Sequence, residues 1–359
     1  MRNKDELIQL VKDFSDAFGP SGFEDEVAKL GRDSVSPRIQ ASTDAIKNTY
    51  FYPKTNTAKR PLVWLDAHAD EVGFIIQALR PNGTLDFLPL GAMTTSELPT
   101  NKVKILNKDN KLVSGIISSK PPHFRTSSDE NKKFEIEDLI MDVGASSLQE
   151  VKDEFGIRMA APVVPDVSCT YDKDHDLFLG KAFDCRIGCA ALIETLDRLS
   201  ESKQNIDYVA TLTTQEEIGG RGAEAAVDII DADVCICFEG CPADDTFSEP
   251  YKVQTALGKG PMLRHFDCCM VTNPSFQRYA LDLAEKLGIP CQESVRKGGG
   301  TNGGIIHKTR HGVPSIVIGI PVRYAHTPHC YCTLEDTLAA IELAVAIVNN
   351  LDAATIDEF

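Results

Sequence analysis

The stretch TTQEEIGGRGA, residues 213–223, places two adjacent carboxylates, Glu216 and Glu217, where a strand runs into a glycine-rich turn. The strand is expected over 209–214, which is rich in β-branched residues. Neighbouring side chains on a strand point to opposite faces, but in the turn that follows they can diverge toward one cavity. One carboxylate can then bind a metal ion while the other acts as a base, as metal-assisted hydrolysis requires. A solvated acidic pair at a strand end is the alternative.

Histidines and carboxylates recur at the ends of other expected elements. An apolar strand that includes Trp64 ends in His68-x-Asp70, and Asp70 lies where it can fix the second ring nitrogen of a metal-binding His68. In an α/β sheet, sites gather at the carboxyl ends of strands. Three more candidates occupy such positions: Asp184 at the start of an expected helix, Glu239 at the end of a buried strand over 234–240, and His326 beyond a strand that starts at Ile316.

In this order the motifs resemble those of the glutamyl and deblocking aminopeptidases, a family of co-catalytic metallopeptidases whose members form tetrahedral shells. The resemblance covers nearly the whole chain, from FGPSGFE at residues 18–24 to the last helix. It implies an α/β fold of the zinc-peptidase type, which is an α/β/α sandwich with an inserted β-rich dimerisation domain. It also implies hydrolysis of N-terminal residues from short peptides.

Carried over position by position, the resemblance implies a site with two divalent ions per chain. His68 and Glu239 would bind one ion, Glu217 and His326 the other, and Asp184 would bridge both. Glu216 would be the general base, and Asp70 would orient His68. Histidine and carboxylate ligands without a thiolate suit Zn²⁺ or Co²⁺, with Mn²⁺ also possible.

Three positions depart from the family's pattern. Glu239 stands where an aspartate is usual, so its carboxylate reaches one methylene further. Cys185 follows Asp184 where Asn or Asp is common, and HTPHC at 326–330 replaces a more usual His-Ser-Pro, so His329 or Cys330 could approach the metals. Two other functions stay open: a related dinuclear amidohydrolase acting on N-acyl amino acids, and a catalytically inactive shell subunit.

Composition narrows the class of protein. The chain has 359 residues and a net charge of −16, which argues against nucleic-acid or anionic-membrane partners. No apolar run approaches the roughly 20 residues of a membrane span, and residues 1–12 lack an apolar signal core, so we expect a cytoplasmic protein. The eleven cysteines suit buried, reduced thiols; several are expected within apolar strands or helices: Cys189, Cys235, Cys237, Cys268 and Cys269.

The alternation of strand-rich and helix-rich segments suggests a split catalytic domain, over 1–72 and 175–359, with a β-rich insert over 73–174. The family resemblance implies that this insert is a β-barrel-like dimerisation domain. We expect the insert to lack a dominant core of its own and to expose edge strands that pair with another chain. The chain would then form a homo-oligomer, a dimer at least and a tetrahedral dodecamer at most. Helices are expected over 5–17, from Asn273 to Gly288, and over 333–349. The run GGGTNGG at 298–304 lacks the Lys-Ser/Thr of a phosphate-binding loop and is expected beside the active site.

Overall fold

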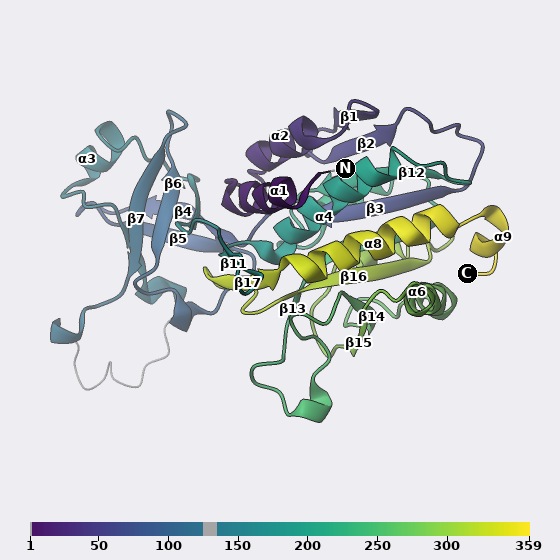
Figure 1. Cartoon of the computed structure of the whole chain (residues 1–359). Helices are drawn as coiled ribbons and strands as arrows, with labels where there is room; N and C mark the ends of the chain where they lie inside the picture. Colours follow the sequence, from purple (N-terminus) through teal and green to yellow (C-terminus); the bar gives the residue numbers. More distant parts are fainter. Residues whose placement is uncertain (1, 125–134) are drawn as a thin grey trace.

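The computed structural model describes residues 2–124 and 135–359 and has an α/β fold around one central mixed sheet, as Figure 1 shows. Strands β12, β3, β13 and β16 lie in its middle and run parallel. These strands are almost wholly buried, which explains their apolar sequences. In spatial order the sheet consists of β1 (Ile39–Thr43), β2 (Thr49–Pro53), β12 (Asp207–Thr213), β3 (Leu62–His68), β13 (Val234–Pro242), β16 (Ser315–Val322), β14 (Met262–Phe266) and β15 (Gln292–Val295).

Helices cover both faces of this sheet, so the expected α/β/α sandwich is confirmed. Strand β3 shows the alternation: Val63 and Leu65 pack into one core, whereas Trp64 packs into the opposite one. The first face carries the longer helices α1 (Lys4–Asp16), α2 (Asp25–Ser34), α4 (Phe183–Leu199), α6 (Pro274–Leu287) and α8 (Leu334–Asn350). The second face carries the short helices α5 (Arg221–Ala226) and α7 (Gly303–Ile306).

A closed barrel projects from one end of the sandwich, on the left in Figure 1. Around the barrel the strands are β4 (Gly73–Leu79), β5 (Leu85–Leu90), β8 (Ile140–Asp142), β7 (Leu112–Ser118), β6 (Lys102–Leu106) and β9 (Pro162–Pro165). Helix α3 (Leu148–Asp153) also belongs to this segment, and Ser147 caps it.

The barrel corrects two expectations about the insert. It has its own core, which includes Phe74, Ile76, Val103 and Met141. Closure also pairs the strands with one another, so the barrel does not offer the open edges that we expected to drive pairing between chains. The short alternating runs in the sequence predicted the β-strands. Closure of the barrel depends on pairs such as β4 with β9, whose residues are far apart in the sequence.

A three-stranded sheet joins the barrel to the sandwich. It consists of β10 (Thr170–Asp172), β11 (Leu177–Gly180) and β17 (Cys330–Thr333). Because β10 and β11 pair, this sheet straddles the boundary expected at Asp174. The division into 1–72, 73–174 and 175–359 stays a prediction.

The predicted helix ends agree with the structure. The Asn273 side chain accepts hydrogen bonds from the amides of Ser275 and Phe276, and Gly288 ends helix α6 at φ 67°. Thr333 caps α8. The last helix of the described chain is the short α9 (Ala353–Ile356), which Asp352 caps.

All eleven cysteines are free thiols, but two lie elsewhere than expected. Cys235 and Cys237 lie side by side in the core strand β13, with their Sγ atoms 3.7 Å apart. Cys268 and Cys269 are exposed in the loop after β14 rather than within a strand. Cys268 and Cys269 precede Met270 and so look like part of an apolar strand in the sequence, but strand β14 ends at Phe266.

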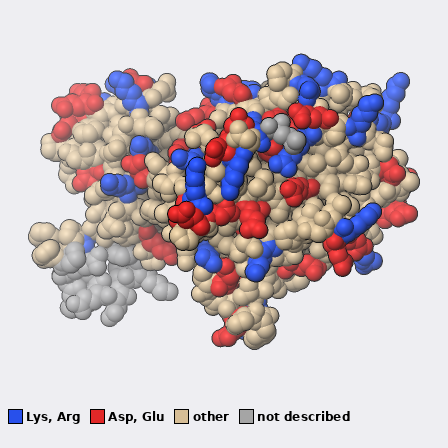
Figure 2. All heavy atoms as spheres, viewed as in Figure 1, with Lys and Arg blue, Asp and Glu red and all other residues tan. Residues whose placement is uncertain are grey.

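The surface in Figure 2 mixes acidic and basic side chains, with no large basic patch on the face shown. None of the helices within residues 2–124 and 135–359 has the length and apolar character that a membrane span needs.

Candidate active site

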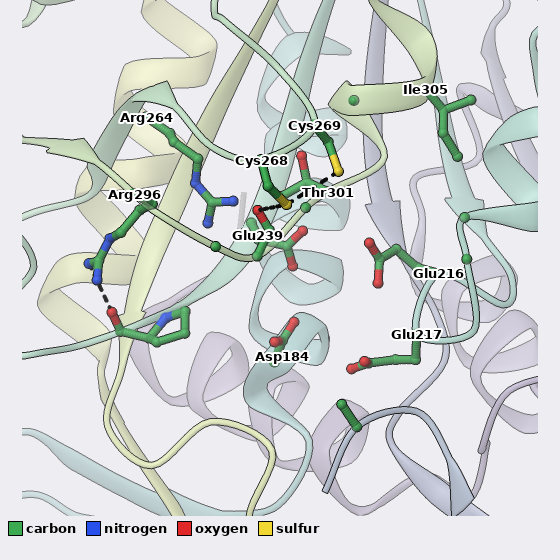
Figure 3. Close-up of a pocket in the computed structure, with 18 of the residues that line it drawn as sticks. Asp184, Glu216, Glu217, Glu239, Arg264, Cys268, Cys269, Arg296, Thr301 and Ile305 are labelled. Carbon is green, nitrogen blue, oxygen red and sulfur yellow. Dashed lines mark hydrogen bonds between the residues drawn. The ribbon is translucent and has the colours of Figure 1, made fainter.

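The seven predicted site residues come together at the carboxyl ends of the parallel strands. Five of them line a pocket of about 860 Å³, namely Asp184, Glu216, Glu217, Glu239 and His326, and Figure 3 shows the first four. His68 ends β3, and its Nε2 lies 3.1 Å from Asp184 Oδ1 and 3.2 Å from Glu239 Oε1. Glu239 comes from β13 and Asp184 from the first turn of α4. These three side chains form the first half of a two-part cluster.

The second half of the cluster lies on the other side of Asp184. His326 Nε2 is 3.1 Å from Asp184 Oδ2 and 3.5 Å from Glu217 Oε2. Each oxygen of Asp184 therefore faces a different histidine. This is the arrangement that a carboxylate bridging two ions requires.

Asp70 orients the residues around it. Its Oδ1 lies 3.2 Å from His68 Nδ1 and accepts a hydrogen bond from the Glu216 amide. Its Oδ2 accepts from Ser21 Oγ at 2.6 Å and from the Glu217 amide at 3.1 Å. Burial alone would raise the pKa of Asp70. The hydrogen bonds that Asp70 accepts, of which the one from His68 has the largest effect, lower this pKa below its ordinary value. One ionised carboxylate thus holds His68 and the backbone of both glutamates.

The two adjacent glutamates diverge as predicted. The turn after β12 places Gln215 at φ 57°, and Gly220 adopts φ 64° before α5. The positive φ favours glycine at this position, and a Cβ atom there would lie 2.2 Å from Ile305 Cδ1, so the isoleucine side chain would have to move. Glu217 faces His326, whereas Glu216 Oε2 lies 4.0 Å from His68 Nε2.

The cluster concentrates negative charge away from water. Burial, reinforced by neighbouring carboxylates, raises the pKa of Glu216 to about 8. Burial and Asp184 raise the pKa of Glu217 well above its ordinary value, and burial also raises the pKa of Glu239. Buried carboxylates in such proximity need positive charge to ionise together.

Divalent cations fit this donor set. Glu217 Oε1 is buried and has no hydrogen-bond partner among the described residues. His326 Nδ1 lies 2.8 Å from the Ala92 carbonyl oxygen, which holds Nδ1–H and leaves Nε2 to face the carboxylates. Burial opposes protonation of this imidazole, but hydrogen bonding to Asp184 raises the pKa of His326 to about 10. A cation would take the place of that proton.

Sequence reasoning missed several residues around the cluster. Ser21 lies in the quoted FGPSGFE motif, but the motif alone did not reveal its bond to Asp70. Ala92 comes from the segment after β5, and its contribution is a backbone oxygen that no motif encodes. Ligand atoms of Cys185, His68 and Glu239 lie within 4.8 Å of one another, although the Cys185 thiol donates to the Phe238 carbonyl.

His329 and Cys330, the two further residues expected to be able to approach the metals, are not part of the cluster. His329 is exposed, and the Cys330 thiol donates to the carbonyls of Tyr324 and Thr327. Among the described residues, the groups that could hold a metal ion include neither of them.

The opposite wall of the pocket carries cations, thiols and the glycine-rich loop (Figure 3). The loop over 298–304 therefore lies beside the site, as expected. The other residues of this wall include Arg264, Cys268, Cys269, Arg296 and Lys308.

Comparison with known proteins agrees with this geometry. The family model described as M42 glutamyl aminopeptidase matches residues 48–343. The chain therefore belongs to the M42 family and is an aminopeptidase. It is 30% identical to the lysyl aminopeptidase of Pyrococcus furiosus, over 96% of this chain and 97% of that protein. It is 27% identical to the glutamyl aminopeptidase of Lactococcus lactis, over 98% of this chain and 99% of that protein.

Among solved structures, the TET aminopeptidase of the marine sediment archaeon Thaumarchaeota archaeon SCGC AB-539-E09 has the same fold. Its TM-score is 0.94 with 34% identity, and the match covers 99% of both chains. Pyrococcus horikoshii TET1, which can assemble into a tetrahedron or a large octahedral shell, is similar in fold at TM-score 0.86 and 23% identity.

One more buried carboxylate lies beside Asp70. Glu24 Oε1 accepts from the amides of Gly22 and Gln215, but Oε2 has no partner among the described residues. Burial, with the charge of Asp70, raises the pKa of Glu24 from 4.5 to about 7. Glu24 therefore stabilises the fold in its protonated form.

We predict that Glu24→Gln changes the pH dependence of stability. The folded pKa exceeds the unfolded one, so the contribution of Glu24 is complete below about pH 4.5 and is lost as the pH rises through about 7. Relative to the glutamine variant, the wild type should lose about 3 kcal/mol of unfolding free energy across that window. Urea unfolding in chelator at the two ends of the window measures this.

Glu26→Gln, an exposed change in the first turn of α2, the helix that Glu24 precedes, is the matched control. This variant should show the same pH dependence of stability as the wild type. Parallel profiles for wild type and Glu24→Gln would contradict the assignment of a protonated Glu24.

Proposed function

We propose that this aminopeptidase removes N-terminal residues from short peptides by a two-metal mechanism in which Glu216 is the general base. The observation that carries the proposal is Asp184, whose two oxygens each lie 3.1 Å from the Nε2 atom of a different histidine. His68 and Glu239 would hold one ion, and Glu217 and His326 the other. Zn²⁺ or Co²⁺ suits these ligands best, and Mn²⁺ also fits.

When bound, the two cations would polarise the scissile carbonyl and make the attacking water a stronger acid. The chain's own residues do the rest. Asp70 holds His68 by its Nδ1 atom and fixes the amide of Glu216, so the base has a defined position. Glu216 accepts the proton from the attacking water and returns it to the leaving amine nitrogen. The buried carboxylates also give the free amine of the substrate a negative subsite.

The direct test combines a metal count with a substrate panel. Protein loaded with Co²⁺, Zn²⁺ or Mn²⁺ should bind about two ions per chain and hydrolyse aminoacyl chromogenic substrates rather than their N-acylated counterparts. If no more than one ion per chain is bound, the site that includes Glu239 does not bind its metal. Preference for N-acylated substrates would indicate the amidohydrolase alternative, and folded protein with no metal and no activity would indicate a shell subunit.

Substitution of each of the two adjacent glutamates should distinguish the general base, Glu216, from the metal ligand, Glu217. Glu216→Gln should retain both ions and lose roughly 10²–10⁴-fold in rate, which is the usual contribution of general acid–base catalysis. Glu217→Gln is the matched variant one residue away, and it should lose metal as well as activity. Elemental analysis and steady-state rates measure both effects. Equal metal retention by the two variants, with Glu217→Gln still active, would overturn these roles.

We also propose a homo-oligomer built from dimers, with the barrel segment as the dimerisation domain and a tetrahedral dodecamer as the largest form. The proposal rests on the family membership and on the shell described for the structurally similar Pyrococcus horikoshii TET1. Enclosed sites would restrict substrates to short, unfolded peptides. A cytoplasmic location is proposed as well, because eleven free thiols suit a reducing compartment.

Light scattering should therefore give a mass several times the 39.2 kDa of one chain. Intact folded proteins should resist cleavage, whereas their short peptides should be degraded. A fully active monomer at micromolar concentration would show that assembly is not required.

A further inference from the structure

Two adjacent thiols lie in the wall of the substrate pocket, and the peptidase mechanism does not use them. Cys268 and Cys269 are exposed and line the same pocket as Glu216 and Glu239. Their Sγ atoms are 3.6 Å apart, and the dashed line in Figure 3 joins them. Ligand atoms of Asp267 and both cysteines lie within 4.8 Å of one another.

The surrounding loops hold this pair in place. Asp267 is buried, accepts from the amides of Cys269 and Met270, and forms an ion pair with Arg264 at 3.0 Å. The Cys268 thiol donates to the Gly299 carbonyl at 3.4 Å. Asp267 is therefore engaged with the backbone and an arginine, which leaves the two sulfur atoms as the available ligands.

The glycine-rich loop makes room for the second thiol. A Cβ atom on Gly300 would lie 2.7 Å from Cys269 Sγ, and one on Gly304 would lie 2.6 Å from Cys269 Cβ. Any other residue at these positions would push Cys269 out of place. This packing gives Gly300 and Gly304 a structural role that does not involve binding a phosphate.

The spacing of the sulfur atoms suits a shared ion better than a disulfide. Disulfide-bonded cysteines usually have Cα atoms about 4.4–6.8 Å apart, whereas neighbouring residues joined by a trans peptide are held at about 3.8 Å. With bonds of about 2.3 Å to a soft cation, sulfurs at this separation subtend roughly 100°, close to the tetrahedral angle.

We propose that Cys268 and Cys269 form a bidentate thiolate site for one thiophilic cation of the Zn²⁺ and Cd²⁺ class, and that its occupation obstructs peptide hydrolysis. Binding breaks two S–H bonds, forms two sulfur–metal bonds and releases two protons to solvent. Burial and the hydrogen bond to Cys268 raise the pKa of the Cys269 thiol, so the apparent affinity should increase with pH. The obstruction rests on the proposed peptidase function, but the binding does not.

Cadmium alone is the first probe, because a Cd²⁺–thiolate bond has an ultraviolet charge-transfer band that can be read without substrate. Protein whose dinuclear site has first been filled with Co²⁺ should develop this band up to one equivalent of Cd²⁺ per chain. Cys268→Ser, Cys269→Ser and the double variant should each lose it. Cys291→Ser, a half-buried thiol that does not line the pocket, is the matched control and should keep it.

Persistence of the band in the double variant would overturn the proposal. If Cys185→Ser removed the band instead, the ion would lie in the His68 cluster, which also overturns it. Near-ultraviolet spectra of every variant before addition of cadmium confirm that each one is folded.

The second readout is the rate with cadmium divided by the rate without it, taken for each variant by itself. One equivalent of Cd²⁺ should slow the wild type and Cys291→Ser at least tenfold and leave this ratio near one for the double variant. Stoichiometric binding with an unchanged wild-type rate would overturn the obstruction. A wild type that hydrolyses no peptide would instead refute the proposed function, while the spectra would still decide on the thiol site.

Discussion

The carboxylate of Asp70 is the constraint on which the candidate active site depends. It is fully buried, so water cannot replace a partner that it loses. Its two oxygens join three distant parts of the chain: Ser21 before α2, His68 at the end of β3, and the amides of residues 216 and 217 after β12. A displacement of this one group would move both a candidate ligand and the candidate base.

A second buried network holds the segment that carries Ser21. The Arg186 guanidinium is wholly buried and donates to the carbonyls of Phe14, Ala17 and Gly19. It also pairs with Glu71, which Lys181 binds at 2.7 Å. The cost of burying these charges is offset because nearly every polar atom of the network has a partner. Helix α4 therefore provides Asp184 through its first turn and anchors the N-terminal segment through Arg186.

The barrel also contributes directly to the site. The Ala92 carbonyl, just beyond β5, holds the Nδ1 atom of His326, and His326 faces the bridging carboxylate through Nε2. The orientation of one candidate metal ligand thus depends on the segment that we propose to mediate dimerisation.

The sequence by itself determined the α/β class, the central strands, the caps of α6, the position of α8, and the identity of the seven clustered side chains. These are local properties: runs of apolar residues, caps such as Asn273, and polar residues at strand ends, where an α/β sheet necessarily gathers them. Only the tertiary structure decided that the barrel has its own core, that Cys268 and Cys269 lie in the pocket rather than within a strand, and that His329 and Cys330 belong to none of the described groups that could hold a metal ion. Those features depend on contacts between residues far apart in the chain and on backbone groups such as the Ala92 carbonyl, which no side-chain pattern encodes.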